Sequence, residues 1–192
     1  MSKVIGIGII CEDLTDYEAV KELVSRIADR TNLRFRPKTG HGSGKIKNKC
    51  LSWSNELQVK GCNMLILIHD LDTNDLDELK TLLKQKMKYS TISNRYVCIP
   101  IKELEAWFLA DPNGIKQSYG IAGLIKIDGM PENINNPKEM LRDKIYTASG
   151  RRIEFVTKHN SKIAKCISLD TVKNKCPTFK EFFDYVYAQT FA

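Results

Sequence analysis

The chain has 192 residues, a formal net charge of +7, 42% hydrophobic residues and 28% charged residues. These values are typical of a globular protein and argue against wholesale disorder. The longest apolar runs, Val4–Cys11 and Met64–Ile68, are far shorter than the roughly 20 residues that cross a bilayer, so we expect no membrane partner. No small-residue cleavage site follows the first apolar stretch, which favours a cytoplasmic protein.

Strand-like and helix-like segments alternate through the first half of the chain. This alternation predicts an α/β, Rossmann-like fold with a mainly parallel sheet flanked by helices. The predicted strands are Lys3–Ile10, Leu33–Phe35, Met64–Ile68 and Tyr96–Ile101. The predicted helices are Asp16–Arg30, Ile46–Val59, Asp75–Lys88 and one beginning with Leu104–Leu109, and Pro37–Lys45 is predicted to be a loop.

The pattern changes after Asp111. Residues Pro112–Asn136 carry loop signals without strong periodicity, and three helices are then predicted at Pro137–Tyr146, Ser161–Ser168 and Thr178–Ala188. We therefore predict an α/β core over residues 1–111 and a helical C-terminal extension over residues 112–192, packed on the core.

Acidic residues follow three of the predicted strands, where ligands bind in open α/β sheets. Glu12 and Asp16 come after the first strand, Asp70 and Asp72 after the third, and Glu105 after the fourth. Carboxylates gathered at one site repel each other, and a divalent cation relieves this repulsion. Oxygen ligands alone suit Mg²⁺ or Mn²⁺. The alternative is that these acids cap helices, which explains Asp16 better than Asp70 or Asp72.

Several motifs together resemble a known family. Glu12–Asp16 (EDLTD) resembles the E-G-x-[ST]-[ED] signature of TOPRIM domains of the OLD-nuclease kind, and Leu65–Asp72 (LILIHDLD) resembles their strand ending in D-x-D. Ile101–Asp111 (IKELEAWFLAD) resembles the E-A-W-x-L-A-D stretch of small TOPRIM-like proteins linked to prokaryotic defence, and Lys158–Phe183 resembles the ending of those proteins. The resemblance covers nearly the whole chain. Asp13 stands where the family usually has Gly.

The resemblance implies a TOPRIM-like fold and a metal-dependent nuclease that acts in anti-phage defence. It makes Glu12, Asp70 and Asp72 the core metal ligands and catalytic residues, with Asp16 as a further metal ligand and Glu105 as a further catalytic residue. The cofactor would be Mg²⁺ or Mn²⁺, which activates water and stabilises charge on a phosphodiester. We expect nucleic acid as a partner and a protein partner from a defence operon; a homodimer is left open.

A basic segment adjoins these acids. Arg34, Arg36, Lys38, Lys45 and Lys47 are predicted to contact the phosphate backbone of nucleic acid. The alternative is a disordered polar loop. The glycines between residues 40 and 44 do not have the spacing of a nucleotide-binding P-loop.

Two other functions compete with the nuclease. A non-catalytic component of a defence assembly would bind nucleic acid or a partner without cutting. A receiver-like signalling domain would use Asp70 as phosphoacceptor, but it requires a lysine after a fifth strand. We predict that Trp107 lies in the core and that His69 is structural.

Overall fold

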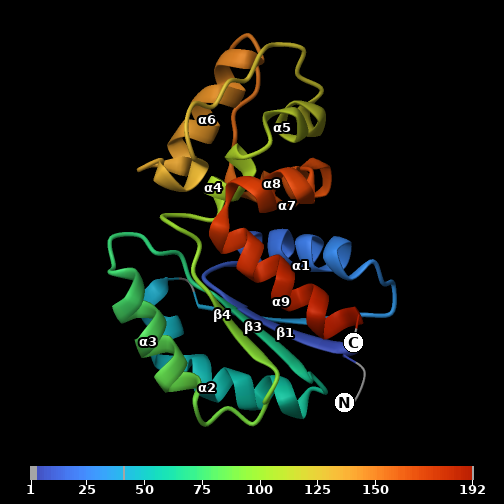
Figure 1. Cartoon of the computed structure of the whole chain (residues 1–192), viewed down its shortest axis with the longest axis vertical. Coiled ribbons are helices and arrows are strands. Elements are labelled where there is room, and N and C mark those ends of the chain that lie inside the picture. The colour runs from blue at the N-terminus through green and yellow to red at the C-terminus, as the bar shows by residue number, and fades with distance from the viewer. Residues whose placement is uncertain (1–3, 41, 192) are drawn as a thin grey trace.

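The computed structural model describes residues 4–40 and 42–191, and only the backbone of Ser43. Four parallel strands form one sheet in the order β2-β1-β3-β4 (Figure 1). The strands are β1 (Gly6–Cys11), β2 (Arg34–Thr39), β3 (Met64–Ile68) and β4 (Arg95–Cys98). The predicted α/β fold with a parallel sheet flanked by helices is confirmed. Lys3 of the predicted first strand and His41 of the predicted loop lie outside the described residues.

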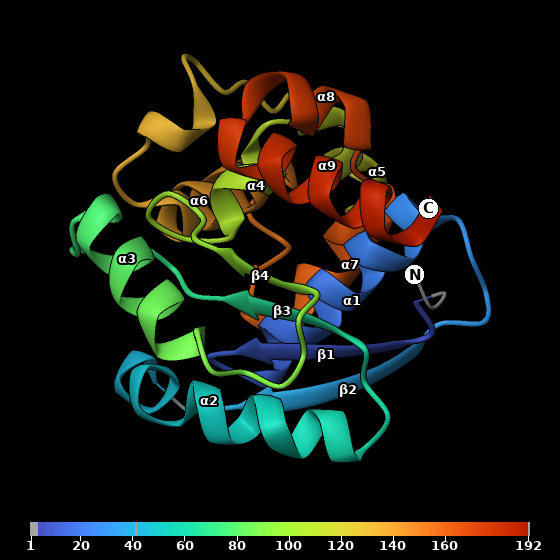
Figure 2. The ribbon, with the colours of Figure 1, turned by 60° about the horizontal axis from the view of Figure 1, so that its bottom comes forward.

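Helices cover both faces of the sheet because successive side chains of a strand point to opposite sides. Ile7 and Ile9 of β1 belong to a core shared with α1 (Leu14–Ala28) and α9 (Pro177–Phe191). Ile10 faces the other way, into a second core beneath α2 (Ser43–Val59) and α3 (Leu76–Met87). Figure 2 shows α2 on one side of the sheet and α1, α7 and α9 on the other.

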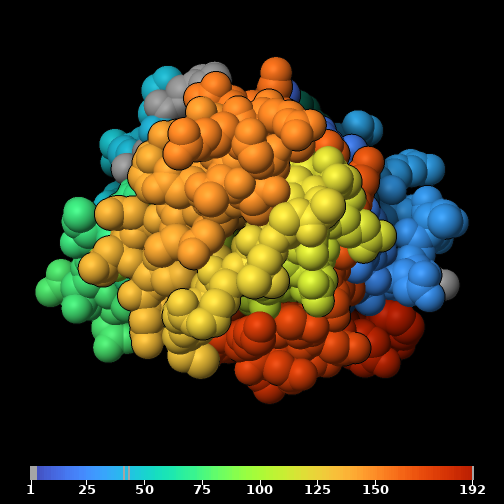
Figure 3. Space-filling model, turned by 90° about the horizontal axis from the view of Figure 1, so that it is seen from above, coloured from blue at the N-terminus to red at the C-terminus, as the bar shows by residue number. Residues whose placement is uncertain are grey.

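The remaining helices follow β4 in the chain. They are α4 (Glu105–Leu109), α5 (Pro112–Tyr119), α6 (Pro137–Ala148), α7 (Asn160–Cys166) and α8 (Leu169–Lys175), with 3₁₀ turns η1 (Pro131–Asn133) and η2 (Thr157–His159). Seen from above in Figure 3, the yellow and orange part of the chain, roughly residues 112–160, covers this end of the molecule. We call residues 112–160 the cap segment. Side chains of the cap segment and of the sheet belong to one hydrophobic core. The predicted domain boundary at Asp111 stays a prediction.

Three parts of the predicted secondary structure were wrong. The segment Pro37–Lys45 is not one loop, because β2 continues to Thr39 and α2 already begins at Ser43. Pro37 is tolerated because β2 is an edge strand that pairs only with β1. The segment Pro112–Asn136 contains α5, whose first turn is capped by the Asp111 side chain. A further helix, α8, was not predicted.

Trp107 lies in the core, as predicted, and is fully buried. Its ring packs against Phe179 and Phe182 of α9. His69 is also fully buried, and its Nδ1 lies 2.7 Å from the carbonyl oxygen of Asp70. Within residues 4–40 and 42–191, no helix is long and apolar enough to cross a membrane.

Candidate metal centre

The carboxyl ends of the strands meet at one edge of the sheet, and acidic residues follow three of them. Glu12 comes directly after β1, and Asp70 lies two residues beyond β3. Backbone pairing continues past the strands: the N–H of Leu71 donates to the carbonyl of Pro100 (3.1 Å), and the N–H of Gly40 donates to the carbonyl of Glu12 (3.0 Å). Neighbouring loops therefore leave the sheet side by side. We call this region the acidic edge.

The carboxylates of the acidic edge perturb one another strongly. Burial raises the pKa of Asp70 well above its ordinary value, and four neighbouring carboxylates raise it further, those of Asp16, Glu105, Glu12 and Asp72. Burial also raises the pKa of Glu12, and the charge of Asp72 adds to this shift. Mutual shifts of this kind require the groups to be close. The charges of the other four carboxylates selected from the sequence thus all act on Asp70, and the roles of the five as ligands and catalysts stay predictions.

Asp13 and Asp16 have different roles at the start of α1. Asp13 caps this helix: its Oδ1 accepts hydrogen bonds from the backbone N–H groups of Thr15 (2.7 Å) and Asp16 (3.0 Å). Its φ of −140° is extended backbone, so a residue other than glycine fits this turn without strain. Asp16 is not needed for the cap. Burial and the charges of Asp13, Glu105 and Glu12 raise its pKa to about 7.

Several carboxylate oxygens at the acidic edge already accept hydrogen bonds from the protein. Oδ1 of Asp70 accepts a hydrogen bond from the backbone N–H of Leu104 (3.1 Å), which fixes Asp70 at the start of α4. Glu105 is only 2% exposed, and its Oε1 accepts a hydrogen bond from Nδ2 of Asn160 (3.1 Å). By contrast, Oε1 of Glu12 is buried without a hydrogen-bond partner. An unpartnered buried acceptor is costly and points to a missing cation or water.

These residues fit a hard divalent cation. The available donors are oxygens, and the orphaned acceptor of Glu12 lies among other negative groups. Among the described residues, no three His, Cys, Asp or Glu side chains already converge in coordinating geometry. Mg²⁺ keeps several of its waters and takes one or two direct carboxylates, so it does not require a closed protein cage. Glu12, Asp16 and Asp72, with the second oxygen of Asp70, are the residues that would hold it.

Two residues of the acidic edge were not found from the sequence. Lys138 lies at the start of α6, and its Nζ is 3.6 Å from Oε1 of Glu103. Asn160 begins α7 and holds Glu105. The Asn-Pro signal at residue 136 does locate the start of α6, but no local pattern shows that this helix ends over the sheet.

A model of the family described as a domain of unknown function, DUF4276, matches residues 11–186. The chain belongs to the DUF4276 family. No curated protein and no solved structure matches it. The matched residues run from the last position of β1 to Val186 in α9, so the DUF4276 region includes the whole acidic edge and the cap segment.

The basic residues predicted to bind nucleic acid are spread along the DUF4276 fold. Lys45 and Lys47 lie in the first turns of α2, and Nζ of Lys47 donates to Oδ1 of Asn74 in the loop after β3 (3.1 Å). Lys38 forms an ion pair with Glu56 of α2. Arg34 and Arg36 are exposed on β2, and Arg34 starts this strand, at the end remote from the acidic edge. Only Lys45 and Lys47 therefore adjoin the acidic edge.

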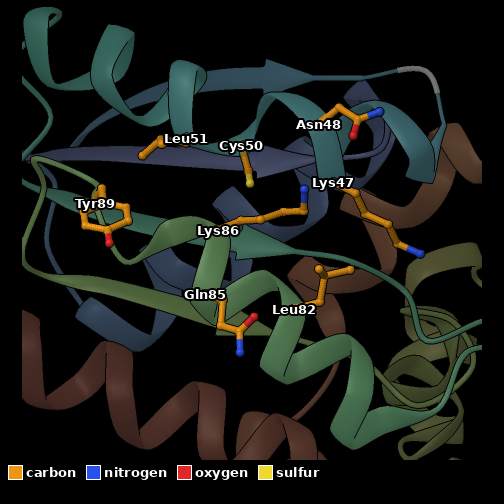
Figure 4. Close-up of a pocket in the computed structure, with 8 residues that line it drawn as sticks. All are labelled: Lys47, Asn48, Cys50, Leu51, Leu82, Gln85, Lys86 and Tyr89. Atoms are coloured by element: carbon orange, nitrogen blue, oxygen red, sulfur yellow. The ribbon is translucent and has the colours of Figure 1, made fainter.

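A hollow of about 460 Å³ lies between α2 and α3 and begins at Lys47 (Figure 4). Two lysines and no acid line it; its residues are Lys47, Asn48, Cys50, Leu51, Leu82, Gln85, Lys86 and Tyr89. The positive charge of Lys47 partly opposes the rise in the pKa of Glu12, so one lysine of the hollow acts electrostatically on the acidic edge. A polyanion that reached the acidic edge would find positive charge on this side of it.

Two non-glycine residues at the acidic edge have a left-handed backbone conformation. Asp72 has a φ of 49° and Lys102 a φ of 63°, and the N–H of Asp72 donates to the carbonyl of Lys102 (3.0 Å). Aspartate tolerates this conformation better than lysine. Paired strain at one position is typical of functional sites.

Replacing Lys102 with glycine should therefore stabilise the protein by about 0.5–1 kcal/mol, because the strained φ is free for glycine and only part of the gain is lost to the more flexible unfolded chain. Urea unfolding measures this change. Lys126→Gly, at an exposed loop position without a positive φ, is the control and should give no gain. If Lys102→Gly were less stable than wild type, the inference that the backbone of Lys102 is strained would be wrong.

Proposed function

We propose that the protein is a TOPRIM-like, Mg²⁺- or Mn²⁺-dependent nuclease that hydrolyses phosphodiesters of nucleic acid. The observation that carries this proposal is the acidic edge, where acids that follow three strands interact electrostatically and one buried oxygen of Glu12 has no hydrogen-bond partner. Such an arrangement is costly to a protein unless it is used. The resemblance of the EDLTD, LILIHDLD and EAWFLAD motifs to TOPRIM nucleases supports the same reaction.

The residues of the acidic edge divide into three tasks. Glu12, Asp16 and Asp72 are available to hold the ion, and the Leu104 N–H holds one oxygen of Asp70 and leaves the other available. A bound divalent ion supplies activated water and charge stabilisation at the phosphate. Lys138 and Lys47, whose charges both reach Glu12, attract the phosphate and hold it beside the carboxylates.

The basic character of the chain favours a polyanionic substrate over a small one. The net charge is +7 although seven acidic residues gather near one edge. The hollow of Figure 4 extends positive charge away from the acidic edge, as a strand of several phosphates requires. A cytoplasmic role in anti-phage defence, with a protein partner from the same operon, is our further proposal from the family resemblance.

The test is cleavage of single- and double-stranded DNA and RNA by the purified protein with Mg²⁺, with Mn²⁺ and with EDTA. We expect cleavage only with a divalent ion, and its loss in Asp70→Ala. Asp143→Ala, an exposed acid of α6, is the matched control and should cleave normally. Because Asp70→Ala also removes a cap of α4, its folding is checked by circular dichroism. Binding of nucleic acid without cleavage would instead support the non-catalytic alternative.

The receiver-like alternative is not carried further. It requires a lysine after a fifth strand, and residues 4–40 and 42–191 form a single sheet of four strands. Lys138, whose charge interacts with that of Asp70, comes from helix α6 and does not follow a strand.

A further inference from the structure

Lys138 brings a fixed positive charge into the acidic edge from a distant part of the chain. It is the second residue of α6, in the cap segment that lies over this end of the molecule (Figures 1 and 3). Its position depends on Glu103, the first acid after β4. The backbone N–H of Lys138 donates to Oε2 of Glu103 (2.9 Å), and its ammonium is 3.6 Å from Oε1. One carboxylate thus holds both the start of α6 and the charge of its lysine.

The ammonium of Lys138 acts on more than one acid. Its interactions with Glu105, Glu103, Asp70 and Asp16 are all attractive. It also interacts favourably with Glu12. Lys138 is only partly exposed, so water screens these attractions incompletely. It therefore supplies to the acidic edge the kind of charge that a metal ion would supply.

Fewer carboxylates are free to bind an ion than the acidic edge contains. Asp13 is committed to α1, Glu103 to Lys138, and Glu105 to Asn160. A two-metal site holds its ions about 3.5–4 Å apart and shares carboxylates between them. What remains here is Glu12, Asp16, Asp72 and one oxygen of Asp70, which suffices for a single hydrated Mg²⁺.

A second observation points to a cation or an ordered water at the acidic edge. Oδ1 of Asn160, a fully buried residue that contacts Glu105, has no hydrogen-bond partner. Oε1 of Glu12 is buried and unpartnered as well. Both orphaned atoms are acceptors in the arrangement that the structure gives. Buried acceptors without donors are satisfied by a cation or by an ordered water, and a hydrated Mg²⁺ would supply both.

We propose that the ammonium of Lys138 supplies the positive charge that a second metal ion would otherwise supply. The acidic edge then binds one divalent cation per chain. This inference rests on the proposed function, because it requires that a metal binds at all. It makes the cap segment part of the metal site, with Glu103 as the residue that positions Lys138.

The experiment counts Mn²⁺ ions bound to the full chain, by titration calorimetry and by the electron paramagnetic resonance signal of free Mn²⁺. Wild type should bind one ion. Lys138→Met removes the charge and frees Oε1 of Glu103, while the backbone N–H still holds Oε2, so this variant should bind two. Lys138→Arg keeps the charge and should bind one. Lys144→Met, on the same helix, is the control and should also bind one.

Each result decides the matter. Two ions on wild type, or a single ion on Lys138→Met, would overturn the inference and leave the nuclease proposal standing. No ion on wild type would overturn both. If Lys138→Met does not fold, Lys138→Gln replaces it, since its side chain keeps a hydrogen-bond donor for Glu103 without the charge.

Discussion

Replacing Asp16 with asparagine is expected to raise the melting temperature of the metal-free protein at pH 8 and to abolish stabilisation by Mg²⁺. Burial and three neighbouring acids raise the pKa of Asp16 from 3.8 to about 7. The folded protein therefore binds this proton more tightly than the unfolded chain does. The stability due to this proton is fully present below pH 4 and is lost as the pH rises to 7. Asparagine removes the repulsion at pH 8, and it removes a metal ligand too.

Thermal unfolding between pH 5 and 8, with EDTA and with Mg²⁺, measures both effects. Each unit of pKa shift corresponds to about 1.4 kcal/mol, so the effect of Asp16 on metal-free stability is on the order of a few kcal/mol. A ligand that binds only the folded state must stabilise it. Mg²⁺ should stabilise wild type more at pH 8 than at pH 5, because Asp16, with a pKa of about 7, is ionised at pH 8 and protonated at pH 5. Asp143→Asn, an exposed acid of α6, should change neither result. A wild-type stability that rises from pH 5 to pH 8 with EDTA would contradict the repulsion.

Replacing Trp107 with alanine is expected to destabilise the protein by about 3–5 kcal/mol. The ring is fully buried, with its centroid 5.1 Å from that of Phe179 and 5.5 Å from that of Phe182. Its Nε1–H also donates to Oγ1 of Thr178 (2.9 Å). The substitution leaves a cavity between α4 and α9 and removes a buried hydrogen bond. Urea unfolding followed by circular dichroism measures the loss.

A phenylalanine at this position separates the two contributions. Trp107→Phe fills most of the cavity, so its smaller loss reports mainly the hydrogen bond to Thr178. Tyr89→Ala is the control, because this ring is 74% exposed, and it should change stability by no more than about 0.5 kcal/mol. A loss below about 1 kcal/mol in Trp107→Ala would show that α9 does not hold its place through this ring.

The sequence predicts best those elements whose pattern comes from burial. Met64–Ile68 was located to the residue, because a fully apolar run of five is typical of a central parallel strand. The end of β2 was missed because this edge strand is exposed, charged and contains Pro37, none of which is typical of strands. Helix α5 was missed because its sequence, PNGIKQSY, contains Gly114 and only a short apolar face.

The acids of the site were located from the sequence because they directly follow strands, whose carboxyl ends must meet at one edge in a parallel sheet. Their catalytic and metal-binding roles are still predictions. Lys138 and Asn160 could not be found in this way. Both belong to helices that reach the acidic edge only through tertiary packing, and their contacts there join residues 35 and 55 positions apart.

The position of α9 has a consequence for synthesis of the protein. This helix closes the core on the α1 face of the sheet, yet roughly 80 residues separate it from β4. At about 5–20 residues per second, a ribosome needs on the order of ten seconds to add them. During that time the part of this core formed by Ile7, Ile9 and Trp107 lacks the cover of α9. The core on this face is thus completed only at the end of synthesis, and chains that end before α9 lack part of it.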